Sequence, residues 1–134
     1  MNTLKSRLLL VLTVLVVAAL ACGGSFSTAN IANAYTTADP NSGSPTTVFA
    51  QDQVFYLIIE LKNAPDDTNV KVVWTAANVE GVDPDTYLDE TTLASGDGIL
   101  TFNLSNSSLW PTGQYKADVY LNDTLDRTLT FEVR

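Results

Sequence analysis

The most informative part of the chain about its fold is Trp110–Arg134, W-P-T-G-Q-Y-K-A-D-V-Y-L-N-D-T-L-D-R-T-L-T-F-E-V-R. Two runs with apolar side chains at alternate positions flank Asn122-Asp123, a pattern that is typical of a β-hairpin. We therefore predict that this stretch forms the last two strands of a sandwich. The chain from about residue 30 to 105 is expected to supply the strands on which the hairpin packs.

The turn of this hairpin allows two registers, and the period of two along a strand distinguishes them. A two-residue turn mixes core and solvent-facing positions across the hairpin, whereas a three-residue turn over 122–124 sets Tyr115 against Phe131. The same register pairs Leu121 with Leu125, Ala117 with Leu129, Lys116 with Thr130 and Asp118 with Thr128. We predict the three-residue turn. Arg127 then becomes the one inward misfit, with its stem packed and its head at the rim.

Upstream of the hairpin, short β-branched and aromatic runs alternate with turn residues, and no helix-period pattern of useful length follows the first 24 residues. We expect three inward-facing sets of side chains on alternate positions. They are Phe55, Leu57, Ile59 and Leu61; Val70, Val72, Trp74 and Ala76; and Leu100, Phe102 and Leu104. A loop with a short strand at 86–89 and a turn at 95–98 are predicted before the last set.

Val54, Tyr56 and Ile58 break the alternation, because they are apolar on the other face of their strand. Two interpretations are open: the N-terminal strand or a loop shields them, or they form an exposed patch for a partner. Trp110, just before Pro111, is expected to plug one end of the sandwich.

The segment 113–117, G-Q-Y-K-A, resembles the G-x-Y-x-C start of strand F in immunoglobulin-like sandwiches. In this resemblance Tyr115 is the corner tyrosine and Trp74 is the core tryptophan of strand C. Ala117 and Ile59 stand at or near the places of the two cysteines, neither of which is present.

The ending W-P-x-G-x-Y…V-Y-L-N…F-x-V also resembles C-terminal domains of many prokaryotic surface and secreted proteins. Together the two resemblances imply an all-β fold over residues 35–134. The expected architecture is an immunoglobulin-like β-sandwich of about seven to eight antiparallel strands without a disulfide.

Residues 1–24 carry the pattern of an export signal: two basic residues, an apolar run over 8–20 and small residues before Cys22. The run of about 14 apolar residues is shorter than the ~20 that a membrane-spanning helix needs. Ala19-Leu20-Ala21-Cys22, followed by two glycines, resembles the lipobox of bacterial lipoproteins. This resemblance implies a signal helix and signal peptide over 1–21 and lipidation of Cys22.

Ordinary secretion is the alternative, since A-x-A cleavage would cut the same bond. The unpaired thiol at the new N-terminus favours the lipoprotein, because two or more acyl chains give a stable anchor. Residues 22–34 are small and polar, and we predict that they form a flexible tether.

After the signal, five basic residues stand against 15 acidic ones, a net charge of −10. This balance argues against nucleic acid and anionic headgroups as partners. The chain has no histidine, and its single cysteine excludes an intramolecular disulfide and Cys-based metal motifs. Without a nucleophile and base pair, we predict no enzymatic activity and no cofactor.

Clustered carboxylates at Asp83, Asp85, Asp89 and Glu90 form a weak candidate calcium loop, and a solvated acidic loop is the alternative. Tyr56 and Tyr120 are the candidate contact surface, since such rings bind protein or carbohydrate ligands.

The sequence thus predicts a module anchored by its lipidated N-terminus to a membrane of the cell envelope, on the extracytoplasmic side, with a binding or structural role. An accessory subunit of an envelope assembly is one alternative. A calcium-dependent adhesion or carbohydrate-binding module is the other.

Overall fold

The computed structural model describes residues 28–134, so the predicted signal helix over 1–21 and the predicted lipidation at Cys22 lie outside the described residues. All regular structure in the described part is β-strand. The strands are β1 (Asn30–Thr37), β2 (Val48–Phe49), β3 (Phe55–Lys62), β4 (Thr68–Val79), β5 (Thr86–Ser95), β6 (Gly98–Leu104), β7 (Gly113–Leu121) and β8 (Thr124–Val133). Residues 30–34, predicted as part of the tether, therefore belong to β1.

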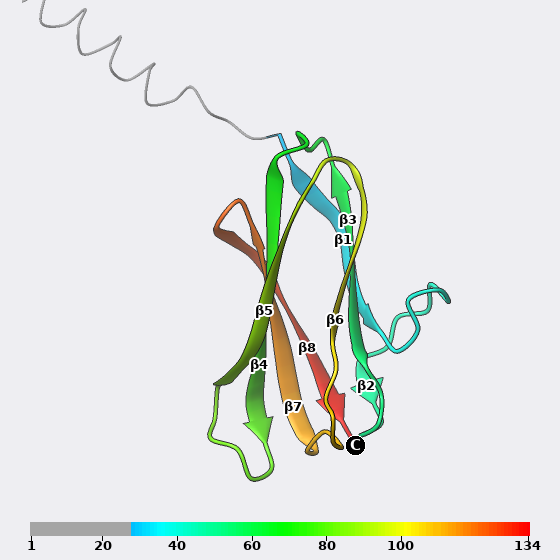
Figure 1. Ribbon diagram of the computed structural model, residues 1–134, viewed down its shortest axis with the longest axis vertical. Coiled ribbons are helices and arrows are strands. Elements are labelled where there is room, and N and C mark those ends of the chain that lie inside the picture. Colours follow the sequence, from blue (N-terminus) through cyan, green and yellow to red (C-terminus); the bar gives the residue numbers. More distant parts are fainter. Residues whose placement is uncertain (1–27) are drawn as a thin grey trace, which may run out of the picture.

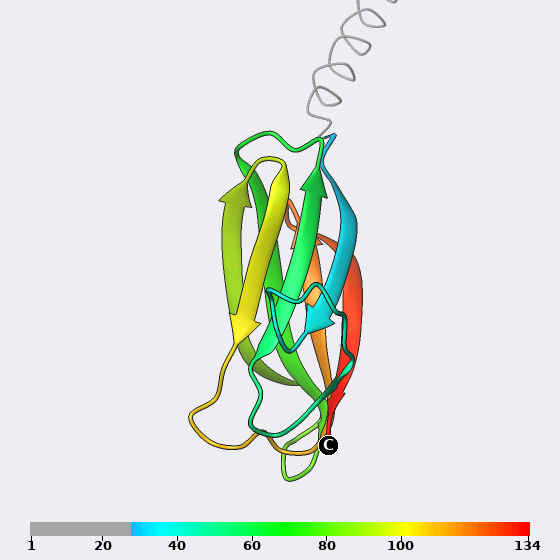
Figure 2. The same cartoon turned by 90° about the vertical axis from the view of Figure 1, so that its right-hand side faces the viewer.

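The strands form two sheets that pack face to face (Figures 1 and 2). One sheet has the order β1-β3-β6, and the other has the order β2-β8-β7-β4-β5. The predicted two-sheet sandwich is confirmed. One pairing is not antiparallel: the short β2 runs parallel to β8, because the chain leaves the first sheet after Thr37 and joins the edge of the second at Val48.

The inward sets predicted for β3 and β4 are confirmed, since each of these eight side chains is at most 1% exposed. In β6, Phe102 and Leu104 are buried, but Leu100 is only partly buried. The difference follows from position. β3 and β4 lie inside their sheets, whereas β6 ends its sheet and has a neighbour on one side only.

The two sheets meet around aromatic rings, with Phe55 at the centre. Its ring stacks on Trp110 at a centroid distance of 4.4 Å and meets Phe131 edge-on at 4.7 Å. Trp110 is buried, and its Nε1 donates a hydrogen bond to the Gln53 carbonyl oxygen at 3.0 Å. The prediction that Trp110 plugs an end of the sandwich is therefore confirmed.

The register of the β7–β8 hairpin agrees with the prediction over most of its length, including Tyr115 opposite Phe131 and Val119 opposite Arg127. The predicted three-residue turn is wrong. The turn has two residues, Asn122-Asp123, with φ angles of 47° and 67° that are typical of a type I′ turn. Tyr120 therefore pairs with Leu125, and Leu121 pairs with Thr124.

A β-bulge reconciles the short turn with the predicted register. The pairing shifts between Val119 and Tyr120, so Asp126 is an extra residue in β8. The alternation of side chains predicted the pairing in the body of the hairpin correctly, but it assigned the extra residue to the turn. A bulge and a longer turn shift the side chains of β8 between the two faces of the sheet in the same way, so alternation cannot distinguish them.

β5 is longer than the predicted strand at 86–89, since it extends from Thr86 to Ser95. It pairs along most of β4, a strand of 12 residues that is long enough to pair with all of β5. All of its side chains are exposed or half-buried, so the apolar alternation that marks a strand is weak there. The predicted turn after it is confirmed, with Gly96-Asp97 between β5 and β6.

Candidate functional site

The two candidate contact tyrosines lie on different faces of the molecule. Tyr56 is in β3, on the outer face of the three-stranded sheet, and pairs in register with Asn103. Tyr120 is in β7, on the outer face of the other sheet, where its ring receives Lys71 Nζ at 4.6 Å from the centroid. Both side chains are half-buried. The structure does not bring them together, so they cannot form one contact surface.

The candidate calcium residues are also dispersed. Asp85 faces Lys116 with 3.4 Å between its carboxylate oxygen and the Nζ atom, and Glu90 accepts a hydrogen bond from Tyr87 at 3.2 Å. Asp83 is in the loop before β5, and the Asp89 carboxylate accepts the backbone N–H of its neighbour. Among residues 28–134, no group of three or more acidic side chains is placed to hold a metal ion.

Tyr87 is the exposed aromatic beside these carboxylates. Desolvation raises the pKa of its phenol, as do the hydrogen bond to Glu90 and the negative charge of Glu90 and Asp89. From the sequence, Tyr87 is a candidate recognition aromatic together with Trp110 and Tyr120, and its acidic neighbours stand two and three positions further on.

The end of the sandwich near β7 is built around the predicted corner tyrosine. Tyr115 is 2% exposed, and its Oη donates a hydrogen bond to the Pro111 carbonyl oxygen at 2.6 Å. A Cβ at Gly113 would lie 2.7 Å from Val79 Cα, so the close approach of β7 to β4 requires glycine there. This corner is structural: it holds the β6–β7 connection against the core.

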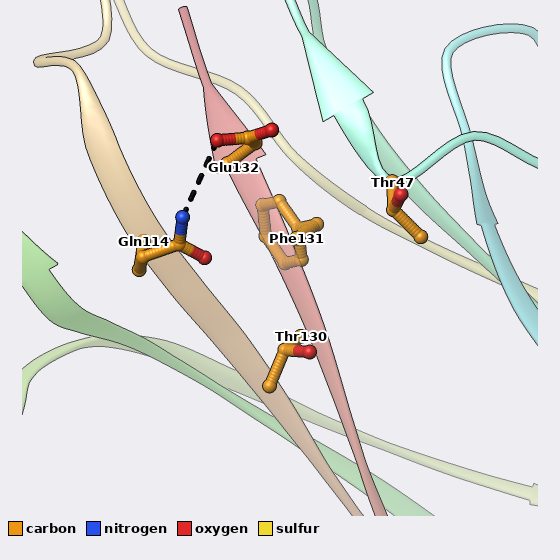
Figure 3. A pocket seen from close by; sticks show the side chains of 5 residues that line it. All are labelled: Thr47, Gln114, Thr130, Phe131 and Glu132. Atoms are coloured by element: carbon orange, nitrogen blue, oxygen red, sulfur yellow. Dashed lines mark hydrogen bonds between the residues drawn. The ribbon is translucent and has the colours of Figure 1, made fainter.

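Three hollows on the surface of the described residues are shallow. One of about 240 Å³, shown in Figure 3, lies over β7 and β8, where Gln114 Nε2 donates to Glu132 Oε2 at 3.3 Å. Another, of about 280 Å³, lies beside the loop after β1. A third, of about 260 Å³, lies where β3 ends and β6 begins, next to Ile99. Small-molecule sites are usually larger, about 300–1,000 Å³.

The outer face of the three-stranded sheet carries both buried and exposed apolar side chains. Ile58 is buried there, flanked in register by Tyr35 of β1 and Thr101 of β6, which supports the interpretation that the N-terminal strand shields it. Ile99 of β6 is 61% exposed. The apolar side chains of this face are thus more exposed to solvent toward β6. The sequence did not mark this strand as a candidate site.

No family model matches the chain, and no curated protein matches it. Solved structures share its fold. An immunoglobulin-like protein from Pseudomonas aeruginosa is 15% identical, with a TM-score of 0.53, over 83% of this chain and 100% of that one. An alkylpurine DNA glycosylase from Pseudomonas fluorescens is 15% identical, with a TM-score of 0.51, over 81% of this chain and 31% of that one. A β-glucosidase from intestinal bacteria is 14% identical, with a TM-score of 0.50, over 82% of this chain and 17% of that one.

At these identities the similarity shows the fold alone. The described chain is an immunoglobulin-like β-sandwich. Its sheet order β1-β3-β6 corresponds to strands A, B and E, and β8-β7-β4 corresponds to G, F and C. In this correspondence Trp74 lies in strand C and Tyr115 in strand F, as the sequence predicted. Within the described residues, no helix is long and apolar enough to span a membrane.

Proposed function

We propose that this chain is a lipid-anchored binding module on the extracytoplasmic side of a bacterial cell envelope. The observation that carries the proposal is the lipobox-like run Ala19-Leu20-Ala21-Cys22 at the end of an export signal. The first strand of the sandwich begins at Asn30, eight residues after that cysteine. An anchor and a folded module are thus separated by a short connection.

The position of the N-terminal strand supports one orientation. Thr28 Oγ1 donates a hydrogen bond to the Asn63 carbonyl oxygen at 2.8 Å, which places the start of the described chain at the β3–β4 turn. The C-terminus lies at the opposite end, together with the loops over 80–85 and 105–112 (Figure 1). Thr28 is six positions after Cys22 in the chain, a separation of at most about 20 Å. An acylated Cys22 would therefore keep the β3–β4 turn near the bilayer and the opposite loops farthest from it.

The charge at the anchored end supports a domain that stands off the bilayer. The turns at this end carry Asp66, Asp67, Asp97 and Asp123. Anionic lipid surfaces attract basic segments and repel acidic ones. The domain would then touch the membrane through its acyl chains alone and leave its sheet faces free for a partner.

The shallowness of the three described hollows supports binding of a macromolecule. The three hollows described above have volumes below those of typical small-molecule sites. Extended faces and edges of a sandwich suit a protein partner better than a small substrate.

Labelling with an alkyne fatty acid in the cells that make the protein tests the anchor. We expect the wild-type chain to carry the label and to sediment with membranes, and Cys22→Ser to lose both properties. A Cys22→Ser/Ser25→Cys variant is the matched control, because it keeps a thiol but moves it out of the lipobox. A Cys22→Ser chain that stays labelled and membrane-bound would contradict the proposal.

Crosslinking in intact envelopes tests the binding role. If the chain is a binding module, we expect it to crosslink to one or a few partner proteins. The yield of these crosslinked products should saturate and should persist when the cells are diluted. A chain that gives no crosslink above the background of an unrelated lipoprotein would refute that role while leaving the anchor intact.

A further inference from the structure

The free edges of the two sheets differ in how they are protected. A strand that ends a sheet presents unpaired N–H and C=O groups, and natural proteins protect such edges with charges, prolines, bulges or covering segments. In the described chain the edges are β1 and β6 in one sheet and β2 and β5 in the other.

Three of these edges carry protective features. β1 has a bulge between Ile31 and Asn33, and its far end bonds to Thr46. β2 is only two residues long and covers the end of β8. The rest of β8, which β2 leaves uncovered, is interrupted by the bulge at Asp126. β5 has charged residues at Asp89 and Glu90 and a register shift beside them.

β6 has none of these features. Its sequence, G-I-L-T-F-N-L over Gly98–Leu104, contains no charged residue and no proline. It pairs with β3 in an unbroken register from Leu61 opposite Gly98 to Phe55 opposite Leu104. Ile99, near its start, is 61% exposed. β6 is therefore a straight, uncharged edge strand with its outer backbone groups available.

Apolar side chains lie beside this edge. Leu88 and Leu93 of β5 and Leu100 of β6 are partly buried against the core. β5 and β6 separate below their common turn on the side of the sandwich that faces the viewer in Figure 1. A strand added to β6 would bond to its free backbone groups and shield these leucines from water.

The charge of the chain indicates the partner. Each of the five basic side chains in residues 28–134 already has an internal partner: four form ion pairs, and Lys71 lies over the ring of Tyr120. The 15 acidic residues outnumber them, so the domain is strongly negative. A second copy would carry the same charge. Antiparallel β6–β6 pairing would also put the two N-terminal ends at opposite ends of the pair, which does not suit two anchors in one bilayer.

We propose that β6 is the docking edge for an extended segment of another protein, apolar at alternate positions and flanked by lysine or arginine. This inference rests on the proposed binding role and names its site and the chemistry of its partner. The segment adds a fourth strand beside β6, its backbone supplies the hydrogen bonds, and its basic flanks are attracted to the acidic domain.

The test uses the full chain in detergent and a panel of labelled nine-residue peptides. They have isoleucine, valine or phenylalanine at alternate positions, threonine between them and lysine at both ends. We expect saturable binding by fluorescence anisotropy, together with slower hydrogen exchange in residues 98–104. Glutamate at the peptide ends should weaken binding at least ~10-fold at low salt. Methylation of alternate backbone nitrogens of the peptide should abolish it, because the added strand then lacks its donors.

Thr101→Lys places a charge in the middle of the edge and should weaken binding at least ~10-fold. Thr130→Lys is the matched control, since it introduces the same charge at an exposed threonine of β8 and should bind like the wild type. Four results would overturn the proposal: no peptide of the panel binds, the two lysine variants bind alike, the methylated peptide binds normally, or protection falls on another strand. A dimer of the full chain that Thr101→Lys dissociates would assign the edge to a second copy instead.

These outcomes are separable from those of the proposed function. Peptide binding does not require acylation, so a chain that binds the peptides and lacks the lipid would refute only the anchor. A chain that carries the lipid and crosslinks to a partner through residues outside β6 would refute only the docking edge.

Discussion

Arg127 Nη2 donates a hydrogen bond to the Ile31 carbonyl oxygen at 2.8 Å, and this bond joins the two sheets. Arg127 lies in β8 opposite the buried Val119, so its side chain starts toward the core. Its Nε bonds to the Asp126 carboxylate at 2.7 Å, which holds the guanidinium at the rim. The bulge in β8 and the bulge in β1 are therefore connected by one side chain.

Replacing Arg127 tests this connection. We expect Arg127→Gln to lower the free energy of unfolding by about 1–2 kcal/mol, because a charge-assisted bond to a backbone carbonyl is lost. Arg134→Gln is the control. Its ion pair with Glu132 is exposed, and such pairs contribute about 0–1 kcal/mol. Urea unfolding followed by tryptophan fluorescence measures both, and equal losses in the two variants would contradict the role of Arg127.

The corner tyrosine gives a second prediction. Tyr115→Phe keeps the buried ring and removes the hydrogen bond to the Pro111 carbonyl oxygen, so we expect a loss of about 1 kcal/mol in unfolding free energy. Tyr120→Phe should change the unfolding free energy by less than about 0.5 kcal/mol, because its half-exposed ring keeps Lys71 over its face. If both substitutions were neutral, the corner bond would have no net effect on stability.

Alkaline pH should destabilise the fold through the same residue. Burial raises the pKa of the Tyr115 phenol above the ordinary value of 10.0. The unfolded chain therefore releases this proton before the folded protein does. The contribution of Tyr115 to stability is complete below about pH 10 and is lost as the pH rises through the folded pKa.

We expect the melting temperature of the wild type to fall more steeply between about pH 9 and pH 11 than that of Tyr115→Phe. Differential scanning calorimetry over this range measures the two slopes. Tyr120→Phe, which retains the buried phenol, should follow the wild type. A slope for Tyr115→Phe as steep as that of the wild type would assign the alkaline loss to other groups.

The hairpin turn gives a fourth prediction. Asp123 has a φ of 67°, a conformation that costs a residue with a Cβ more than it costs glycine. Asp123→Gly should raise the unfolding free energy by about 0.5–1 kcal/mol, since Asn-Gly is the preferred type I′ pair. Asp123→Ala should lower it. Urea unfolding distinguishes the two signs, and a stabilising Asp123→Ala would refute the type I′ assignment.

Several features of the fold could be predicted from the sequence because they depend on neighbours in the chain. The alternation of Phe55, Leu57, Ile59 and Leu61 marks a strand and its inner face without knowledge of its partner. The G-x-Y spacing at 113–115 likewise marks the corner, since a glycine and a tyrosine two residues apart serve the same local turn. The signal-like pattern before Cys22 is local too, and it lies outside the described residues.

Other features depended on pairing between distant segments. Parity along β8 is the same for a three-residue turn and for a two-residue turn with a bulge at Asp126, so alternation could not separate them. Tyr56 and Tyr120 both point away from the core, but only the sheet assignment shows that they lie on opposite faces. The acidic residues near 83–90 are close in the sequence, yet their strand and loop positions direct them to different partners.

Most strands, the inner faces of β3 and β4 and the acidic balance of charge could be predicted from the sequence alone, because these follow from side-chain period and composition. The tertiary structure was needed to show which strands end their sheets, and thus that the uncharged β6 has an unprotected edge. Strand order is set by contacts between segments far apart in the chain, so no local pattern in G-I-L-T-F-N-L can distinguish an edge strand from a central one.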